Sequence, residues 1–109
     1  MIIYNVTLNI DNTIHQKWLE WMKDKHIPKV LGTGKFKKAV FSQVMVDDDG
    51  ESKTYSVQYF AESRETLDSY YTHEAPALRQ EGLELFSDKM LAFRTELEVV
   101  DEYFVHQNN

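Results

Sequence analysis

His26 is the side chain whose type and position are best suited to proton transfer. An imidazole titrates near neutral pH, so a histidine beside a pocket can pass protons as a shuttle. It lies just before Pro28, where a helix is expected to break, and helical spacing brings it near Trp18 or Trp21. The simpler interpretation is a histidine at the end of a helix, stabilised by the negative end of the helix dipole. The sequence alone favours this simpler interpretation over a catalytic role.

Aromatic side chains are abundant, with six Phe, six Tyr and two Trp in 109 residues. Large rings bury more area each than aliphatic side chains, so a small core can depend on them. Some of these rings could instead form the walls of a pocket for a small-molecule ligand. The candidate walls are Trp18, Trp21, Tyr55 and Tyr59. Aromatic residues at helical spacing more often belong to a core, and the sequence leaves both interpretations open.

Composition and spacing exclude several classes of site and partner. The chain has no cysteine, which excludes disulfides, thiolate nucleophiles and iron–sulfur sites. The four histidines lack metal-ligand spacing and residues 47–51 lack that of an EF-hand loop, so we expect no metal and no cofactor. A net charge of −6 without a basic face argues against a nucleic-acid partner. Without a membrane-length apolar run or a signal-peptide pattern, we expect a cytoplasmic protein that binds no membrane.

The N-terminal third of the chain predicts a strand followed by a helix. Residues 2–10 alternate apolar with mostly polar side chains, as in a strand with one buried face. Thr13 and Gln16 have the spacing of a capping box, which predicts the start of the helix, although Asp11 could serve as the cap instead. The apolar stripe of this helix contains Ile14, Trp18, Trp21 and Met22. Pro28 predicts that the helix breaks or kinks near Ile27.

The middle of the chain predicts a β-hairpin and two short helices. Residues 36–46 and 54–61 are rich in β-formers, and the acidic segment 47–51 with its Asp-Gly step is a hairpin turn. Ser63 is placed to cap a short helix. Pro76 suits the first turn of another helix, so the second helical region is divided in two.

Residues 90–100 predict the last strand and complete the order βαββαβ. This order is the ferredoxin-like plan of the α+β class, a four-stranded antiparallel sheet with its helices on one face. The length of the chain suits one domain, which we place at residues 1–104, with a flexible C-terminal tail at 105–109.

One face of the predicted sheet is left without helices. We expect the helices to cover the face that bears Tyr4, Val6, Leu8, Tyr55, Val57, Tyr59, Phe93 and Leu97. The opposite face mixes apolar and uncharged polar groups with few charges, which is typical of a half-wet interface. Its expected members include Asn5, Gln58, Phe60, Arg94 and Glu96. This face predicts a homodimer of stacked sheets with Arg94 and Glu96 paired across the seam, whereas an open sheet facing water is the simpler alternative.

Several segments resemble the dimeric α/β-barrel superfamily. They are the Trp-x-x-Trp-Met segment at 18–22, the Lys-His-Ile-Pro segment at 25–28 and the Gly-x-Gly at 32–34 before the second strand. Over nearly its whole length the chain is also similar to an uncharacterised domain-of-unknown-function family. The resemblance implies ferredoxin-like subunits whose sheets pair into a barrel, with a pocket between helix and sheet. The superfamily includes antibiotic-biosynthesis monooxygenases, and some members act by acid–base chemistry without a metal or cofactor.

Two functions fit these features. The first is a non-catalytic dimeric module, structural or regulatory, whose sheet face is its working surface. The second is a cofactor-independent, monooxygenase-like or otherwise small-molecule-converting enzyme, with His26 as proton shuttle in a helix–sheet pocket. The sequence favours the first because it requires less of the individual residues.

Overall fold

The sheet is four-stranded and antiparallel, and it holds the two longest strands of the chain side by side at its centre. The computed structural model describes residues 1–46 and 50–106. The elements follow in the order β1 (Ile2–Asp11), α1 (His15–Trp21), the π-helical turn η1 (Met22–His26), α2 (Ile27–Leu31), β2 (Ala39–Gln43), β3 (Ser52–Ala61), α3 (Arg64–His73), α4 (Ala75–Phe86), the 3-10 turn η2 (Ser87–Lys89) and β4 (Met90–Glu98).

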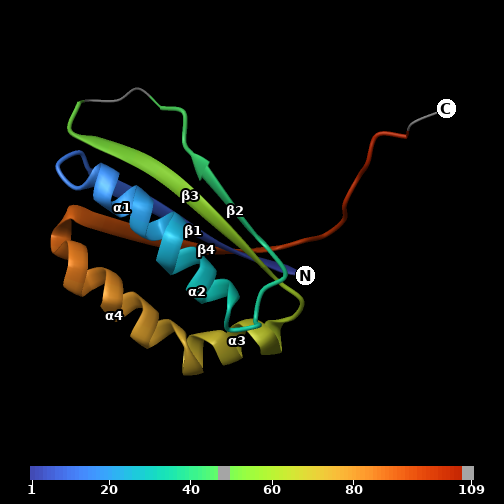
Figure 1. Ribbon diagram of the computed structural model, residues 1–109. Coiled ribbons are helices and arrows are strands. Elements are labelled where there is room, and N and C mark those ends of the chain that lie inside the picture. Colours follow the sequence, from blue (N-terminus) through green and yellow to red (C-terminus); the bar gives the residue numbers. More distant parts are fainter. Residues whose placement is uncertain (47–49, 107–109) are drawn as a thin grey trace.

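The strand order β2-β3-β1-β4 confirms the predicted ferredoxin-like plan. Strand β1 pairs with β3 along its whole length and with β4 over nearly all of it, so it lies in the interior of the sheet. Figure 1 shows both helical regions on the same side of the sheet. Crossovers of one hand place both helical regions on one face, and the other face carries no helix.

The first helix begins differently from the prediction. The expected capping box between Thr13 and Gln16 is wrong, because Ile14 is the N-cap and its side chain makes no capping hydrogen bond. The backbone N–H and the hydroxyl of Thr13 both donate to Oδ1 of Asp11, at 2.8 and 2.6 Å. The hydroxyl is thereby engaged by the preceding turn, so it is not available to the helix.

Near Ile27 the prediction was a break or a kink: the helix does not break, and its geometry changes through a π-helical turn just before Ile27. Helix α1 runs into the π-helical turn η1, and α2 follows without an intervening loop. Pro28 lies in the first turn of α2, where a missing N–H disrupts the hydrogen-bond ladder least. The wider π turn takes up the residues before the proline, and His26 is its last residue.

The hairpin of β2 and β3 is confirmed, with Phe41 opposite Val57. Strand β2 is shorter than expected and begins at Ala39, and Phe36 packs into the core before the strand starts. Of the predicted turn at 47–51, residues 47–49 lie outside the described part of the chain. The helix caps after β3 follow the prediction: the Ser63 hydroxyl accepts from the Thr66 N–H, and α4 carries its proline in the first turn.

The side-chain phase of β4 is opposite to the predicted one. Val6 pairs with Arg94 and Thr7 pairs with Phe93. Directly opposed residues share a face, so Arg94 faces the helices with Val6, whereas Phe93 lies on the open face. The same alternation moves Glu96 to the helical side and Leu97 to the open side. The prediction assigned Phe93 and Leu97 to the core because they are apolar, but the register leaves them 64% and 45% exposed.

The core lies between the sheet and the helices. Its largest fully buried side chains are Trp18, Ile10, Leu67, Val30 and Val57. The ring of Tyr4 stacks on those of Phe36 and Tyr59 and meets Tyr71 edge-on. None of the helices in the described residues is long and apolar enough to cross a membrane.

Candidate functional site

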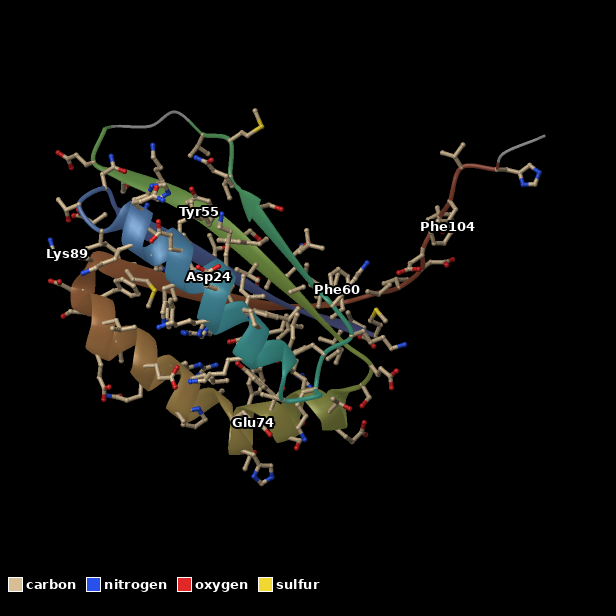
Figure 2. All side chains as sticks on the ribbon, in the orientation of Figure 1. Asp24, Tyr55, Phe60, Glu74, Lys89 and Phe104 are labelled. Atoms are coloured by element: carbon tan, nitrogen blue, oxygen red, sulfur yellow. The ribbon has the colours of Figure 1, made fainter. Side chains whose placement is uncertain are left out.

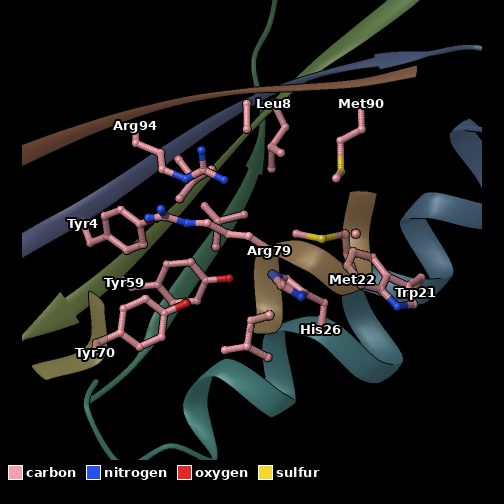
Figure 3. Close-up of a pocket in the computed structure, with 15 residues that line it drawn as sticks. Tyr4, Leu8, Trp21, Met22, His26, Tyr59, Tyr70, Arg79, Met90 and Arg94 are labelled. Atoms are coloured by element: carbon pink, nitrogen blue, oxygen red, sulfur yellow. The ribbon is translucent and has the colours of Figure 1, made fainter. Parts of the chain in front are cut away.

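A small cavity of about 60 Å³ lies between the sheet and the helices (Figure 3). The sheet lines it with Tyr4, Val6, Leu8, Val57, Tyr59, Met90, Ala92 and Arg94. The helices line it with Trp21, Met22, His26, Tyr70, Leu78, Arg79 and Gly82. Gly82 lets α4 approach the opposite wall, because a Cβ there would lie 2.8 Å from Cε of Met90 and 3.5 Å from Trp21. The cavity is smaller than the roughly 300–1,000 Å³ typical of pockets for drug-sized ligands.

His26 enters the cavity from the π turn. Its ring stacks on Trp21, with ring centroids 4.5 Å apart and planes inclined by 24°. Its Nδ1 is buried and has no hydrogen-bond partner among the described residues. Burial lowers the pKa of His26 to about 4; Glu81 opposes this shift, and Lys29 and Arg94 add to it. At neutral pH the imidazole is therefore uncharged.

Two of the three arginines in the chain line the cavity. Arg79 comes from α4, and its Nη2 donates to the hydroxyl of Tyr4 at 3.0 Å. Arg94 comes from β4 and reaches the same cavity from the sheet. Figure 3 shows both guanidinium groups on the side of the cavity near the ring of Tyr4. Among the described residues, neither has a carboxylate within ion-pair distance.

Two tyrosine hydroxyls complete the polar lining. Burial raises the pKa of Tyr59 well above its ordinary value, and the neighbouring Tyr70 and Tyr4 add to the shift. Burial likewise raises the pKa of Tyr70, against the opposing effect of Arg79 and Arg94. Both phenols therefore stay protonated at neutral pH and can donate hydrogen bonds. Figure 3 shows their hydroxyls directed toward the same space as His26.

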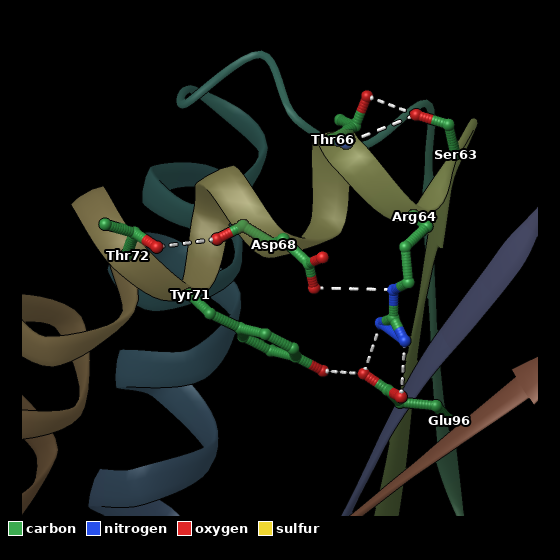
Figure 4. Close-up of polar contacts among 7 residues, drawn as sticks. All are labelled: Ser63, Arg64, Thr66, Asp68, Tyr71, Thr72 and Glu96. Atoms are coloured by element: carbon green, nitrogen blue, oxygen red, sulfur yellow. Dashed lines mark hydrogen bonds and ion pairs between the residues drawn. The ribbon is translucent and has the colours of Figure 1, made fainter.

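Glu96 belongs to a polar network that joins β4 to α3 (Figure 4). Arg64 binds its carboxylate with two hydrogen bonds, of 3.0 and 2.7 Å. The hydroxyl of Tyr71 donates to Oε2 of the same carboxylate at 2.6 Å. Arg64 also lies 3.4 Å from a carboxylate oxygen of Asp68. The expected pairing of Arg94 with Glu96 across a dimer seam is wrong, because Glu96 faces the helices and is bound by Arg64.

The open face of the sheet bears no ionisable side chain over most of its area. The strand registers assign to it Ile3, Asn5, Thr7, Asn9, Val40, Ser42, Ser52, Thr54, Ser56, Gln58, Phe60, Leu91, Phe93, Thr95 and Leu97. Several of the polar members bond one another: the amide of Asn5 donates to the Thr95 hydroxyl at 3.2 Å and accepts from Ser56 at 2.8 Å. Asp11 is at the end of the face, where β1 stops. In a chain with 28% charged residues, such a face is distinctive.

The chain matches the model of a family described as a domain of unknown function, DUF4286, over residues 1–100. The protein belongs to the DUF4286 family. Two solved structures of dimeric ferredoxin-like proteins from uncultured marine organisms have the same fold, each with a TM-score of 0.65. The first is 15% identical, over 94% of this chain and 97% of that one; the second is 13% identical, over 96% and 100%. No relative was found among curated proteins.

The predicted pocket residues of this DUF4286 protein divide into two groups. His26, Trp21 and Tyr59 line the cavity. Trp18 and Tyr55 lie beside it in the core, where their ring centroids are 5.0 Å apart. The indole N–H of Trp18 points to the sulfur of Met90 at 3.2 Å, and the hydroxyl of Tyr55 lies 2.6 Å from Nε2 of His15. These two rings therefore support the wall without forming it.

Arg79 is the cavity residue that sequence reasoning missed, whereas Arg94 was singled out but assigned to the opposite face of the sheet. On α4, Arg79 follows Leu78 and precedes Gly82 by three residues. The same side of the helix therefore carries an apolar side chain, a cation and a glycine that leaves space for both. That spacing is the signal that could have found it. No group of three metal-ligating side chains converges anywhere in the described residues.

Proposed function

We propose that this protein is a non-catalytic homodimeric binding module in which two subunits pack through their open sheet faces. The observation that carries this proposal is that none of the fifteen strand residues of that face, defined above, is charged. The nearby charges are at its margin: Asp11 at the end of β1, and Lys38, whose ammonium lies 4.6 Å from the centroid of the Phe60 ring. Interface cores are depleted in charged residues and enriched in aromatic ones. An isologous pair of such faces is the simplest closed assembly.

The apolar groups of the face support the same conclusion. Phe93 and Leu91 are 64% and 51% exposed, and Phe60 lies on the same surface. Asn5 already satisfies its amide within the face, so covering it requires little loss of hydrogen bonds to water. Both marine proteins of similar fold are described as dimeric.

The cavity favours binding over catalysis. A general base is most effective when its pKa is close to the working pH. Burial lowers the pKa of His26 to about 4, so the imidazole is a weak base at pH 7. The imidazole stacks on the apolar ring of Trp21, and its Nδ1 has no hydrogen-bond partner among the described residues that would orient it for proton transfer.

The oligomeric state tests the proposal directly. Sedimentation velocity at micromolar concentration should give the mass of a dimer for the wild-type chain. Phe93→Lys should give a monomer, because each subunit would then bury an unpaired charge in the interface. Leu83→Lys is the matched control, since Leu83 is 56% exposed on α4, away from the sheet, and should leave the dimer intact.

A wild-type monomer at these concentrations would overturn the proposed assembly. So would dissociation of the Leu83→Lys variant with retention of the dimer by Phe93→Lys, because the interface would then be helical. Far-ultraviolet circular dichroism on both variants would establish that each remains folded.

A further inference from the structure

We infer that the cavity between α4, η1 and the sheet binds a small organic carboxylate, held by Arg79 and Arg94. This inference rests on the proposed function, since it assigns a ligand class to a binding module. The cavity, the two guanidinium groups and the apolar walls carry it together.

The cavity carries two positive charges, both on exposed residues that have no ion-pair partner among the described residues. The third arginine, Arg64, is saturated by Glu96, whereas the two at the cavity have no carboxylate partner among the described residues. Arg79 is bound by a neutral hydroxyl, that of Tyr4, which leaves its charge in place. Two like charges near one another favour an anion between them.

The acidic groups nearby are not among the residues that line the cavity. Glu81, which acts electrostatically on His26, is bound by Lys29 at 2.6 Å on the helical side. Glu74 acts on Tyr70 from the junction of α3 and α4 and is not among the lining residues. An anion in the cavity would therefore meet the guanidinium groups first.

The neutral polar groups suit the second oxygen of a carboxylate. Tyr59 and Tyr70 are held protonated by burial, so each can donate a hydrogen bond. The Nδ1 of His26 is buried without a partner and can accept or donate according to its tautomer. Guanidinium groups match the planar, two-oxygen geometry of a carboxylate better than an ammonium does.

Size and apolar lining restrict the rest of the ligand. One enclosed water occupies roughly 10–15 Å³ of such space, so a cavity of about 60 Å³ holds about four to six water-sized groups. Val57, Met22 and Leu78 form walls that would leave the polar shell of inorganic phosphate unsatisfied. A short aliphatic acid such as butyrate has a carboxylate for the guanidinium groups and an alkyl chain for the apolar walls.

A titration of the protein with sodium butyrate tests the inference. Proton–nitrogen correlation spectra, recorded at pH 7 and constant ionic strength, should show saturable shifts around the cavity. The dissociation constant should be on the order of 1 mM, as befits a ligand of six heavy atoms. Butyramide, which has the same shape without the charge, should bind about tenfold or more weakly. Inorganic phosphate should bind more weakly than butyrate.

Substitution of Arg94 should then show whether this arginine contributes to binding. Arg94→Gln should weaken butyrate binding about tenfold or more, because it removes a charge-assisted hydrogen bond. Lys23→Gln is the control, since it removes the same charge from an exposed position outside the cavity and should leave the affinity unchanged. Arg94→Lys should fall between wild type and Arg94→Gln. The spectra themselves report whether each variant is folded.

Three results would overturn the inference: no saturable shift, equal affinity for butyramide and butyrate, or an Arg94→Gln variant that binds as wild type does. Tighter binding of phosphate would reject the carboxylate as ligand class. Sedimentation on the same samples separates this outcome from a failure of the proposed function. A dimer without butyrate binding rejects only the ligand, and a butyrate-binding monomer rejects only the sheet-face assembly.

Discussion

His26 shows how the environment decides the chemistry of one side chain. Its ring lies between Trp21 and the cavity, and burial lowers its pKa to about 4. In the unfolded chain an imidazole has a pKa of about 6.5, so the unfolded state binds the proton first as pH falls. The folded protein should therefore lose stability between about pH 6.5 and pH 4.

Substitution of His26 should remove this pH dependence. The full shift corresponds to about 3 kcal/mol of unfolding free energy, complete above pH 6.5 and lost as pH falls through 4. Urea denaturation of His26→Gln at several pH values should give a flatter profile over that window. His73→Gln is the control, because His73 is exposed at the end of α3. This variant should keep the pH profile of stability of the wild type. Parallel profiles for wild type and His26→Gln would contradict the assignment.

For single residues, the sequence predicts contacts between neighbours that are close along the chain and not contacts between residues that are far apart in it. Trp21 and His26 could be paired because both lie on one helical segment, and their stacking follows from local spacing. Arg79 and Arg94 come to the cavity from α4 and β4, and only the packing of the helix on the sheet brings them together. No spacing within either segment specifies that meeting.

At the scale of elements, the Glu96 network holds α3 against the edge of the sheet. Glu96→Gln keeps the shape of the side chain but removes the charge that Arg64 binds twice. Unfolding free energy should fall by about 1 kcal/mol, as for a partly exposed bidentate pair. Glu98→Gln is the matched control: Glu98 is exposed on the same strand and has no ion-pair partner among the described residues.

The dimer should not respond to this substitution, because Glu96 faces the helices. Equilibrium denaturation reports the stability, and sedimentation of the same variant reports the assembly. A Glu96→Gln protein that dissociates while Phe93→Lys remains dimeric would restore the interface predicted from the sequence.

The elements themselves were largely predictable, and their ends and phases were not. Alternation over residues 2–10 fixed both the existence and the faces of β1, because its two sides differ clearly in polarity. In β4 the polar residues Arg94 and Glu96 lie on the helical side of the sheet, where they remain exposed, and Phe93 lies on the open side. The usual assignment of apolar residues to the core therefore gave the opposite phase. On the helical side Glu96 is bound by Arg64, and Arg94 lines the cavity. Both arrangements depend on tertiary contacts, which the pattern of one strand does not reveal.

At the scale of the whole molecule, the two proposed surfaces lie on opposite sides of one sheet. Arg94 faces the cavity, while its neighbours Phe93 and Thr95 face the open side. Substitutions at Phe93 and Arg94 therefore affect different surfaces although the residues are adjacent in sequence. This alternation is what allows the assembly and the ligand to be tested independently.

The C-terminal segment after β4 should contribute little to folding. Residues 99–106 form no helix or strand, and Figures 1 and 2 show the segment, with Phe104, extending away from the sheet. Phe104 is 83% exposed.

Truncation in the monomeric Phe93→Lys background tests this expectation. A chain ending at Val100 should have a free energy of unfolding within about 0.5 kcal/mol of that of the longer chain, because little buried surface is lost. A chain ending at Thr95, which removes the end of β4, should lose more than about 2 kcal/mol in the same urea titration. A large loss on ending at Val100 would mean that residues beyond Val100 stabilise the folded domain despite their exposure. Equal stability of the two truncations would instead mean that the end of β4 contributes little.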